Sequence, residues 1–273
     1  MDRNNEARGK GSAATGQDEG CDWLSILPCL DSPAMGQERR RELDIDRTEA
    51  ARLGQAAVAW SRQGWYPDKV GKQVSIAAQV ARTAALKQSL APDAGLPKVP
   101  EGVAPKETRV QVSNETTFQA AHRLVSKGSK VLTLNFANGI SAGGGFLHGA
   151  RAQEEVLCRS SALYLTLEGD LMYSFHRSRP RPDSSSWCIL SPEVPVFRED
   201  KGTTLDEPWL LSFITCAAPV APRVGRELSA ILLRERIQRV YSIARAFGYD
   251  SLVLGAWGCG AFGNDSQSTA RSF

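Results

Sequence analysis

The sequence contains few of the side chains that build metal centres or disulfide frameworks. Its 273 residues include only six cysteines and three histidines. No two cysteines form a C-x-x-C pair and no two histidines have metal-ligand spacing, which excludes the usual structural zinc sites and disulfide frameworks. We therefore expect free thiols, a reducing intracellular location in the cytoplasm or nucleus, and neither a metal nor a cofactor.

Long apolar runs and a strong charge imbalance are also missing. No run approaches the roughly 18–20 apolar residues that a membrane span needs. The 33 basic and 30 acidic residues leave a net charge of only +3, which is too small to indicate direct binding of nucleic acid or a membrane. With 42% hydrophobic and 23% charged residues, the chain has ordinary globular composition, and we expect a monomer.

Changes in composition along the chain predict three regions. Residues 1–36 are rich in Gly, Ser, Asn and acidic residues, which indicates a mostly disordered arm with an apolar docking patch at residues 23–30. Residues 37–106 are predicted to be a helical accessory region, broken at Gly64 and Pro67, with a second helix over residues 76–90 and a Pro-rich linker after it. Residues 107–273 form the predicted catalytic domain.

The third region alternates between strand and helix patterns. Apolar runs predict strands at residues 131–136, 187–190, 211–218 and 252–254. Helical periodicity predicts helices at residues 117–127, 156–167 and 228–247. This alternation predicts an α/β fold with a largely parallel or mixed sheet and helices on both faces. Ligands in such sheets bind at loops that leave the carboxyl ends of the strands.

Two glycine-rich loops each follow a predicted strand. The first, residues 135–146, contains Gly143, Gly144 and Gly145, and the second spans residues 255–264. Glycine lets the backbone approach a ligand closely and turn its N–H groups toward an anion. Two such loops side by side suit a nucleotide with a diphosphate, although neither matches the P-loop and the first lacks the hydride-cofactor fingerprint. A three-glycine run taken alone is as well explained by a tight turn.

The triplet Gln153, Glu154 and Glu155 opens an apolar helix, and a spacer of seven residues separates it from Gly145. Acidic residues at a helix start commonly interact with the helix dipole, and that is the simpler explanation for the pair taken alone. After a glycine loop that holds a nucleotide, however, a carboxyl group lies within reach of the bound sugar. The spacing therefore makes the two glutamates candidates for chemistry.

Together these motifs resemble the bacterial-type poly(ADP-ribose) glycohydrolases, a branch of the macrodomain fold. The family has three glycines, a spacer of six to eight residues and Gln-Glu-Glu, as this chain does. Residues 134–137, 157–164, 191–197 and 255–264 are also similar to the family. The resemblance spans about residues 41–265. It implies a macrodomain-like mixed sheet flanked by helices, with an N-terminal helical extension.

The resemblance implies a glycosidase that cleaves ribose–ribose O-glycosidic bonds and releases ADP-ribose, with poly(ADP-ribose) or ADP-ribosylated protein as its partner. Glu155 is implied to be the general acid, and Glu154 to hold hydroxyls of the bound ribose. Asn138 and Phe262 would contact the distal ribose, and the two glycine loops would wrap the diphosphate. The implied substrate-binding residues are Asn138, Gly143, Gly144, Gly145, Gln153, Gly258, Cys259, Gly260, Ala261 and Phe262.

Several further residues have two interpretations. Trp257 either stacks on adenine or packs in the core. His148 is better explained as an exposed loop residue than as a second proton carrier, and Cys259 as a small buried residue than as a nucleophile, since no histidine is near it in sequence. The basic run of Arg177, Arg179 and Arg181 is better explained as a solvated loop than as a contact with polymer phosphates.

The chain departs from its family at two places. Ala142 stands where relatives carry proline, which loosens the first loop without removing a ligand group. After Asp265, relatives continue with a proline, a helix and a further strand, whereas this chain ends at Phe273. We therefore expect a truncated C-terminal helix and strand, with a sheet edge and apolar core surface exposed. This keeps two alternatives open: an ADP-ribose-binding module without turnover, and a mono-ADP-ribosyl hydrolase. The Gln-Glu-Glu triplet favours the enzyme.

Overall fold

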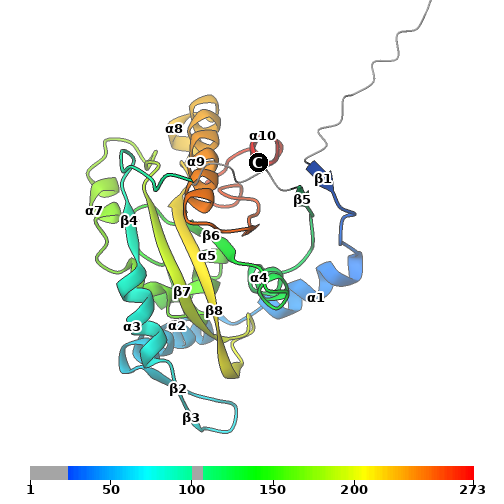
Figure 1. The fold of residues 1–273 in the computed structure, drawn as a ribbon, viewed down its shortest axis with the longest axis vertical. Coiled ribbons are helices and arrows are strands. Elements are labelled where there is room, and N and C mark those ends of the chain that lie inside the picture. Colours follow the sequence, from blue (N-terminus) through cyan, green and yellow to red (C-terminus); the bar gives the residue numbers. More distant parts are fainter. Residues whose placement is uncertain (1–23, 100–106) are drawn as a thin grey trace, which may run out of the picture.

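The centre of the molecule is a five-stranded mixed sheet (Figure 1). A computed structural model of the protein describes residues 24–99 and 107–273. The strands lie in the order β4 (Gln88–Leu90), β7 (Cys188–Arg198), β8 (Thr204–Ala217), β6 (Val131–Ala137) and β9 (Ser251–Val253). β4, β7 and β8 pair antiparallel, whereas β6 runs parallel to both β8 and β9. The predicted mixed sheet is confirmed.

Helices cover both faces of this sheet (Figure 1). On one face, α9 (Arg226–Ala246) packs Leu233, Ile237 and Val240 against Leu132 and Ile214. The other face carries α2 (Arg47–Gln63), α3 (Ala77–Leu86), α4 (Thr117–Val125), α5 (Gln153–Ser160), α6 (Leu163–Leu167) and α7 (Leu171–Arg177). Because β6 is buried on both faces, its sequence is a nearly continuous apolar run. The polar exceptions, Thr133 and Asn135, are buried within it.

The helical N-terminal region was predicted correctly in kind but not in its boundaries. α1 (Pro33–Leu43) and α2 are separate, because Asp46 caps α2 by accepting from Thr48 N at 2.7 Å. α2 ends at Gly64, whose φ of 82° closes the helix in the left-handed region. A hairpin of β2 (Trp65–Pro67) and β3 (Gln73–Ser75) follows. No helix in the described ranges has the length and apolar character that crossing a bilayer requires.

Two predicted helices are wrong in part. The helix over residues 76–90 ends at Leu86, and its last residues form the edge strand β4, where pairing with β7 buries Leu90. The helix over residues 156–167 is two helices, α5 and α6. Between them Ser161 bonds back to Leu157 O at 2.8 Å and Ala162 N donates to Pro195 O at 3.0 Å, so sheet contacts interrupt the helix.

Residues 24–36, which composition predicted to belong to a mostly disordered arm, contain a strand and the start of a helix. β1 (Leu24–Ile26) pairs in parallel with β5 (Thr108–Val110). α1 then begins at Pro33 behind the cap Ser32, whose hydroxyl accepts from Met35 N at 3.1 Å. That part of the prediction is wrong. Residues 1–23 and 100–106, which include Trp23 and part of the predicted linker, lie outside the described residues.

A short helix, α10 (Ser266–Ser272), follows the second glycine loop. Asp265 caps it by accepting from Ser268 N at 2.7 Å. β9 forms one edge of the sheet. Leu252 and Leu254 on this edge are nevertheless only partly exposed, because they pack against the α9 cluster. The exposure of apolar core surface expected there is therefore small.

Candidate active site

The two glycine-rich loops leave the same edge of the sheet. β6 and β9 are parallel neighbours, so the loops that follow them emerge side by side, as predicted. The ring of Phe136, at the end of β6, lies beneath the second loop. A Cβ at Gly255 would be 2.9 Å from Phe136 Cζ, so glycine is needed there for the loop to approach β6.

The side chain of Gln153 joins the start of α5 to β6 by hydrogen bonds. β9 pairs only with residues 131–133 of β6, which leaves the next backbone groups on that side of β6 without a strand partner. Gln153 takes this place, since its Oε1 accepts from Phe136 N at 2.9 Å and its Nε2 donates to Leu134 O at 2.8 Å. The Gln153 amide is therefore engaged by the scaffold in this structure, and the substrate contact implied for this residue stays a prediction.

Glu154 is buried and bonded through both carboxyl oxygens. Its Oε2 accepts from Asn138 N at 2.7 Å, and its Oε1 accepts from Asn135 Nδ2 at 3.4 Å. Burial raises the pKa of Glu154 to about 8, the N–H of Asn138 opposes this rise, and the nearby charge of Glu155 adds to it. Glu154 therefore holds a proton at neutral pH.

Glu155 and the glycines of the first loop are in direct contact. Glu155 is 8% exposed, and its Oε1 accepts from Gly145 N at 3.0 Å. Gly144 has a φ of 59°, and a Cβ there would overlap Glu155 Oε1 and lie 3.0 Å from Glu154 Oε2. Glycine is therefore required at position 144 both by its backbone conformation and by the two carboxyls. The juxtaposition predicted from the spacing is confirmed.

Asn138 shapes the start of the first loop. Its Oδ1 accepts from Ile140 N at 2.9 Å and from Ser141 N at 3.1 Å, which forms an Asx turn. With its backbone N–H on Glu154 and its amide oxygen inside the loop, only its Nδ2 group remains to donate to a ligand. Contact between Asn138 and the distal ribose stays a prediction.

The first loop is held from behind by α7, which sequence reasoning missed. His176 is buried, with Nδ1 2.9 Å from Gly139 O and Nε2 2.7 Å from Ser185 Oγ. Burial lowers its pKa to about 4, so His176 is neutral, and the facing carbonyl assigns its proton to Nδ1. Arg177 Nη1 donates to Ile140 O at 2.7 Å. No local motif marks either residue, because their partners lie 37 positions away.

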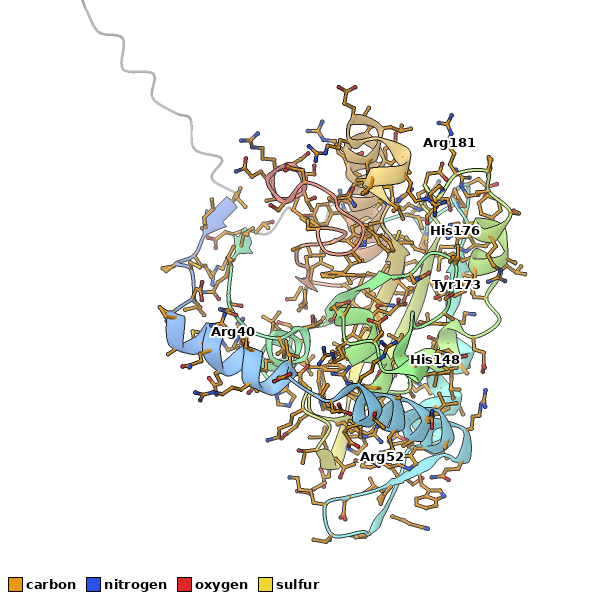
Figure 2. All side chains as sticks on the ribbon, turned by 180° about the vertical axis from the view of Figure 1, so that it is seen from behind. Arg40, Arg52, His148, Tyr173, His176 and Arg181 are labelled. Carbon is orange, nitrogen blue, oxygen red and sulfur yellow. The ribbon has the colours of Figure 1, made fainter. Side chains whose placement is uncertain are left out.

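The basic run that begins with the last residue of α7 is therefore only partly a solvated loop. Arg177 holds the first glycine loop, which corrects that interpretation for this residue. Arg179 forms an ion pair with Asp183 at 2.6 Å. Arg181 is exposed, as predicted. Figure 2 shows Arg181 at the periphery of the molecule, whereas His176 lies farther in.

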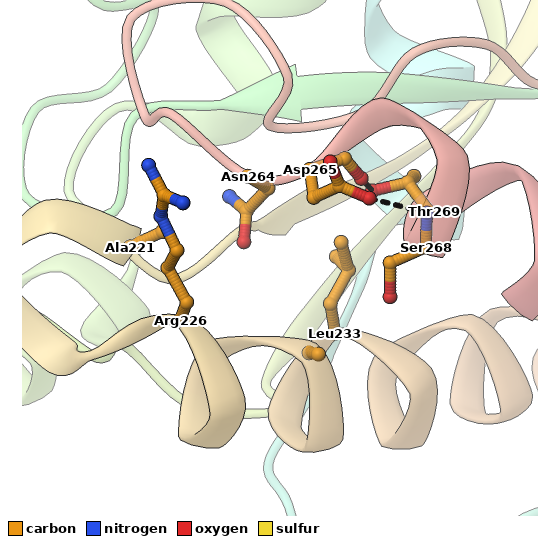
Figure 3. A pocket seen from close by; sticks show the side chains of 8 residues that line it. Ala221, Arg226, Leu233, Asn264, Asp265, Ser268 and Thr269 are labelled. Atoms are coloured by element: carbon orange, nitrogen blue, oxygen red, sulfur yellow. Dashed lines mark hydrogen bonds between the residues drawn. The ribbon is translucent and has the colours of Figure 1, made fainter.

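Asn264 fixes the second loop, and this residue was also missed. Its Nδ2 donates to Pro219 O at 2.9 Å and to Gly258 O at 3.1 Å, and its Oδ1 accepts from Ser229 Oγ at 2.6 Å. It thereby joins the loop to the exit of β8 and to α9 (Figure 3). Gly258, with a φ of 75°, leaves room for the Asn264 amide.

The remaining predicted residues divide between core and surface. Trp257 is fully buried in the α9 cluster, so the core interpretation is confirmed and stacking on adenine is excluded in this structure. Phe262 is half-buried against the same cluster, and its ribose contact stays a prediction. Cys259 is half-buried rather than buried. His148 is exposed beside α2, as predicted (Figure 2).

The arrangement suits sugar chemistry on a nucleotide. The exposed Gly260 and Ala261 of the second loop and the positive-φ glycines of the first offer backbone N–H groups to a diphosphate. Two buried carboxyls lie directly behind the first loop. Over residues 24–99 and 107–273, no group of three or more His, Cys, Asp or Glu side chains could hold a metal ion.

Comparison with known proteins gives one consistent family. The family model described as microbial-type PARG, catalytic domain, matches residues 54–199. The chain is similar to the poly(ADP-ribose) glycohydrolase (PARG) of Thermomonospora curvata, with 39% identity over 83% of this chain and 86% of that chain and a TM-score of 0.76. It is also similar to PARG of Deinococcus radiodurans in complex with ADP-ribose, with 44% identity over 58% and 67% of the two chains and a TM-score of 0.55. No curated protein sequence matches it.

Proposed function

This chain belongs to the microbial-type poly(ADP-ribose) glycohydrolase family, and we propose that it hydrolyses the ribose–ribose O-glycosidic bonds of poly(ADP-ribose) to release ADP-ribose. The observation that carries the proposal is the contact of Gly144 with the carboxyls of Glu154 and Glu155. A diphosphate held by this loop brings its attached ribose to the two carboxyls. The solved complex of the D. radiodurans relative with ADP-ribose supports the same ligand class.

Glu155 is the general acid in this proposal. Gly145 N–H holds one carboxyl oxygen, which leaves Oε2 to give a proton to the ribose oxygen that departs. The ribose then develops oxocarbenium character and is attacked by water. Because the two glutamates are adjacent on one helix turn, they cannot flank the bond as an ordinary glycosidase pair. One working acid and a positioned water is the mechanism that fits.

Glu154 supports this step by geometry and by charge. It ties Asn138 to α5 and presents its buried carboxyl to the ribose hydroxyls. Because burial raises the pKa of Glu154 to about 8, this carboxyl is neutral at pH 7 and the pair carries at most one negative charge. The diphosphate of a bound substrate adds negative charge nearby and favours the protonated state of the pair.

The ligand we propose is poly(ADP-ribose), either as the free polymer or attached to protein. We also propose that the protein acts in a reducing compartment, the cytoplasm or nucleus. The described cysteines Cys29, Cys158, Cys188, Cys216 and Cys259 are all free thiols, which supports such a location.

The test compares wild type with Glu155→Gln on poly(ADP-ribose). The glutamine oxygen still accepts from Gly145 N–H, so the loop is kept and only the acid is removed. We expect release of ADP-ribose to fall by at least about 10²-fold, the low end of what general acid catalysis contributes. Glu235→Gln on α9, an exposed position, is the matched control and should keep wild-type turnover.

Two other outcomes would replace the proposal. Release of ADP-ribose from mono-ADP-ribosylated protein but not from polymer would indicate a mono-ADP-ribosyl hydrolase. Calorimetric binding of ADP-ribose without release from either substrate would indicate a binding module. Wild-type turnover by Glu155→Gln would remove Glu155 from the mechanism.

A further inference from the structure

A cavity of about 550 Å³ lies at the amino-terminal end of β8. It is lined by the end of α1, by α4, and by the segment that joins β7 to β8. Within the described chain, no part of this lining comes from the glycine loops or from α5. β8 leaves the cavity at Trp209 and ends beside the first loop at Ala217, roughly 25 Å farther along the strand. The cavity is therefore separate from the candidate active site.

A large bulge in β8 opens this cavity. β7 and β8 pair Arg198 with Thr204 and Val196 with Trp209. The two positions from 196 to 198 on β7 therefore face the five positions from 204 to 209 on β8, and residues 205–208 bulge out of the ladder. Side chains of this bulge line the cavity. Bulges are common beside functional sites, because they turn side chains away from the direction that regular pairing imposes.

The lining of the cavity includes an aromatic cluster built around Trp209. The indole of Trp209 is half-buried, and the rings of Phe118 and His122 on α4 lie nearly perpendicular to it. Their ring centroids are 6.0 and 5.0 Å from that of Trp209. α4 thus fixes the orientation of the indole. Because the face of a tryptophan ring attracts cations more strongly than other aromatic rings do, this cluster suits a positively charged ligand.

The charged side chains of the lining are mostly acidic. The carboxyls are those of Glu42, Glu199, Asp200 and Glu207, and the cations are those of Arg198 and Lys201. Both cations are already engaged, since Lys201 pairs with Glu199 at 3.1 Å and Arg198 donates to two backbone carbonyls at 2.5 and 2.8 Å. Glu42 is paired with Arg39 at 2.6 Å. The charges that remain unbalanced are therefore negative.

Asp200 and Glu207 are the two carboxyls without a cation. Neither forms an ion pair within residues 24–99 and 107–273. Asp200 is 7% exposed, and its Oδ2 accepts from Thr116 Oγ1 at 2.6 Å, whereas its Oδ1 has no partner among the described residues. Burial raises the pKa of Asp200, as expected of a carboxyl that lacks an ion-pair partner. A cation that enters the cavity can supply this partner.

The size and chemistry of the cavity favour an organic cation. No group of three or more His, Cys, Asp or Glu in the described part of the chain could hold a metal ion. The volume of about 550 Å³ falls in the range of about 300–1,000 Å³ that is typical of sites for organic ligands. Polymer phosphates would be repelled by the carboxyls. A guanidinium stacks on an indole and binds a carboxylate through two N–H groups, so arginine matches both parts of the lining.

We propose that this cavity binds a basic peptide segment, with an arginine side chain against Trp209 and in an ion pair with Asp200 or Glu207. The segment belongs to the ADP-ribosylated protein, so the cavity holds the carrier while the glycine loops hold the nucleotide. The source of the segment rests on the proposed glycohydrolase function, whereas binding of the peptide does not. Because the two sites are separate, peptide and ADP-ribose bind without competing.

The test is calorimetry of the full chain with a short peptide of alternating glycine and arginine, and with the same peptide carrying glutamine for arginine. The arginine peptide should bind at least about tenfold more tightly. Glu207→Gln changes an exposed carboxyl and should weaken binding about fivefold. Asp200→Asn still accepts from Thr116 and should weaken it about tenfold. Asp206→Asn is the matched control, because Asp206 pairs with Lys69 at 3.4 Å outside the lining, and should keep wild-type affinity.

Three results would overturn the peptide site. These are equal affinity for the two peptides, equal weakening by Asp206→Asn and Glu207→Gln, and competition between the arginine peptide and ADP-ribose. The source of the segment is tested by the KM for polymer carried on a basic protein, which should rise about fivefold in Glu207→Gln and not in Asp206→Asn; equal KM values would overturn it. If wild type cleaves no polymer, the proposed function fails while calorimetry still decides on the peptide site, so the two failures are distinguishable.

Discussion

Replacing Glu154 by Gln should make the protein more stable above pH 5, by an amount that grows with pH. In the folded protein, burial raises the pKa of Glu154 to about 8, whereas its ordinary value is 4.5. Between these two values the unfolded chain is ionised at this residue and the folded chain is not. The folded state then binds more protons than the unfolded state, so wild-type stability falls as pH rises through this window. Below pH 4.5, Glu154 is protonated in both the folded and the unfolded state, so it does not reduce the stability.

The size of the effect follows from the width of the window. Each unit of pKa difference corresponds to about 1.4 kcal/mol, so ionising Glu154 in the folded state costs up to about 5 kcal/mol by pH 8. Relaxation and entry of water reduce such penalties, and we expect about half of this, roughly 2–3 kcal/mol. A glutamine at position 154 has no ionisation to suppress. Its oxygen still accepts from Asn138 N, and rotation of the Asn135 amide turns Oδ1, which has no partner in the described chain, toward the new NH₂ group in place of Nδ2.

Urea unfolding followed by tryptophan fluorescence, repeated from about pH 5 to pH 9 in small steps, measures this directly. The free-energy difference between Glu154→Gln and wild type should rise with pH and level off near pH 8. Glu235→Gln removes an exposed carboxyl from α9 and should follow wild type at a constant offset. A Glu154→Gln difference that also stays constant across the range would refute the reasoning, because Glu154 would then ionise equally in both states.

Two further substitutions test the glycine loop. Gly144→Ala should abolish release of ADP-ribose from polymer and destabilise the protein by more than about 2 kcal/mol, because its Cβ overlaps a carboxyl. Gly169→Ala is the control, because Gly169 has a similar φ of 73° and open space where a Cβ would lie. Thermal melting of this variant should show only the backbone cost of about 1–2 kcal/mol. Equal losses of stability in the two variants would show that the carboxyl contact is unimportant. His176→Ala removes the donor to Gly139 O and should weaken ADP-ribose binding about tenfold by calorimetry, whereas His148→Ala at an exposed site should not. Unchanged affinity in His176→Ala would show that the loop keeps its shape without this anchor.

The centre of the site can be predicted from sequence because its parts are close along the chain. Gly144, Glu154 and Glu155 lie within one loop and one helix turn, so their spacing alone limits how far apart they can be. The strand before each glycine loop also predicts at which edge of the sheet the loop emerges. Both inferences use local geometry, and the structure confirms both.

The residues that hold the two glycine loops in place cannot be predicted in this way. His176 and Asn264 reach partners 37 and 45 positions away, and neither has a local pattern that separates it from an ordinary polar residue. The edge strand β4 was predicted wrongly as helix for the same reason. Its sequence continues a helical pattern, and only pairing with residues 188–190 of β7 makes it a strand. Such features depend on which distant segments meet, and periodicity does not encode that.

The roles of residues inside a motif depend on which of their polar atoms the protein already uses. Gln153 belongs to the motif, yet β9 is too short to cover β6, and the Gln153 amide is consumed in completing the sheet. Glu154 has both oxygens engaged. Asn138 keeps its Nδ2, and Glu155 keeps its Oε2, for which the described residues offer no partner. A ligand can therefore engage Oε2 of Glu155 and Nδ2 of Asn138 without sharing them with a protein contact. A ribose hydroxyl at Glu154 would have to share its oxygens with Asn135 and Asn138.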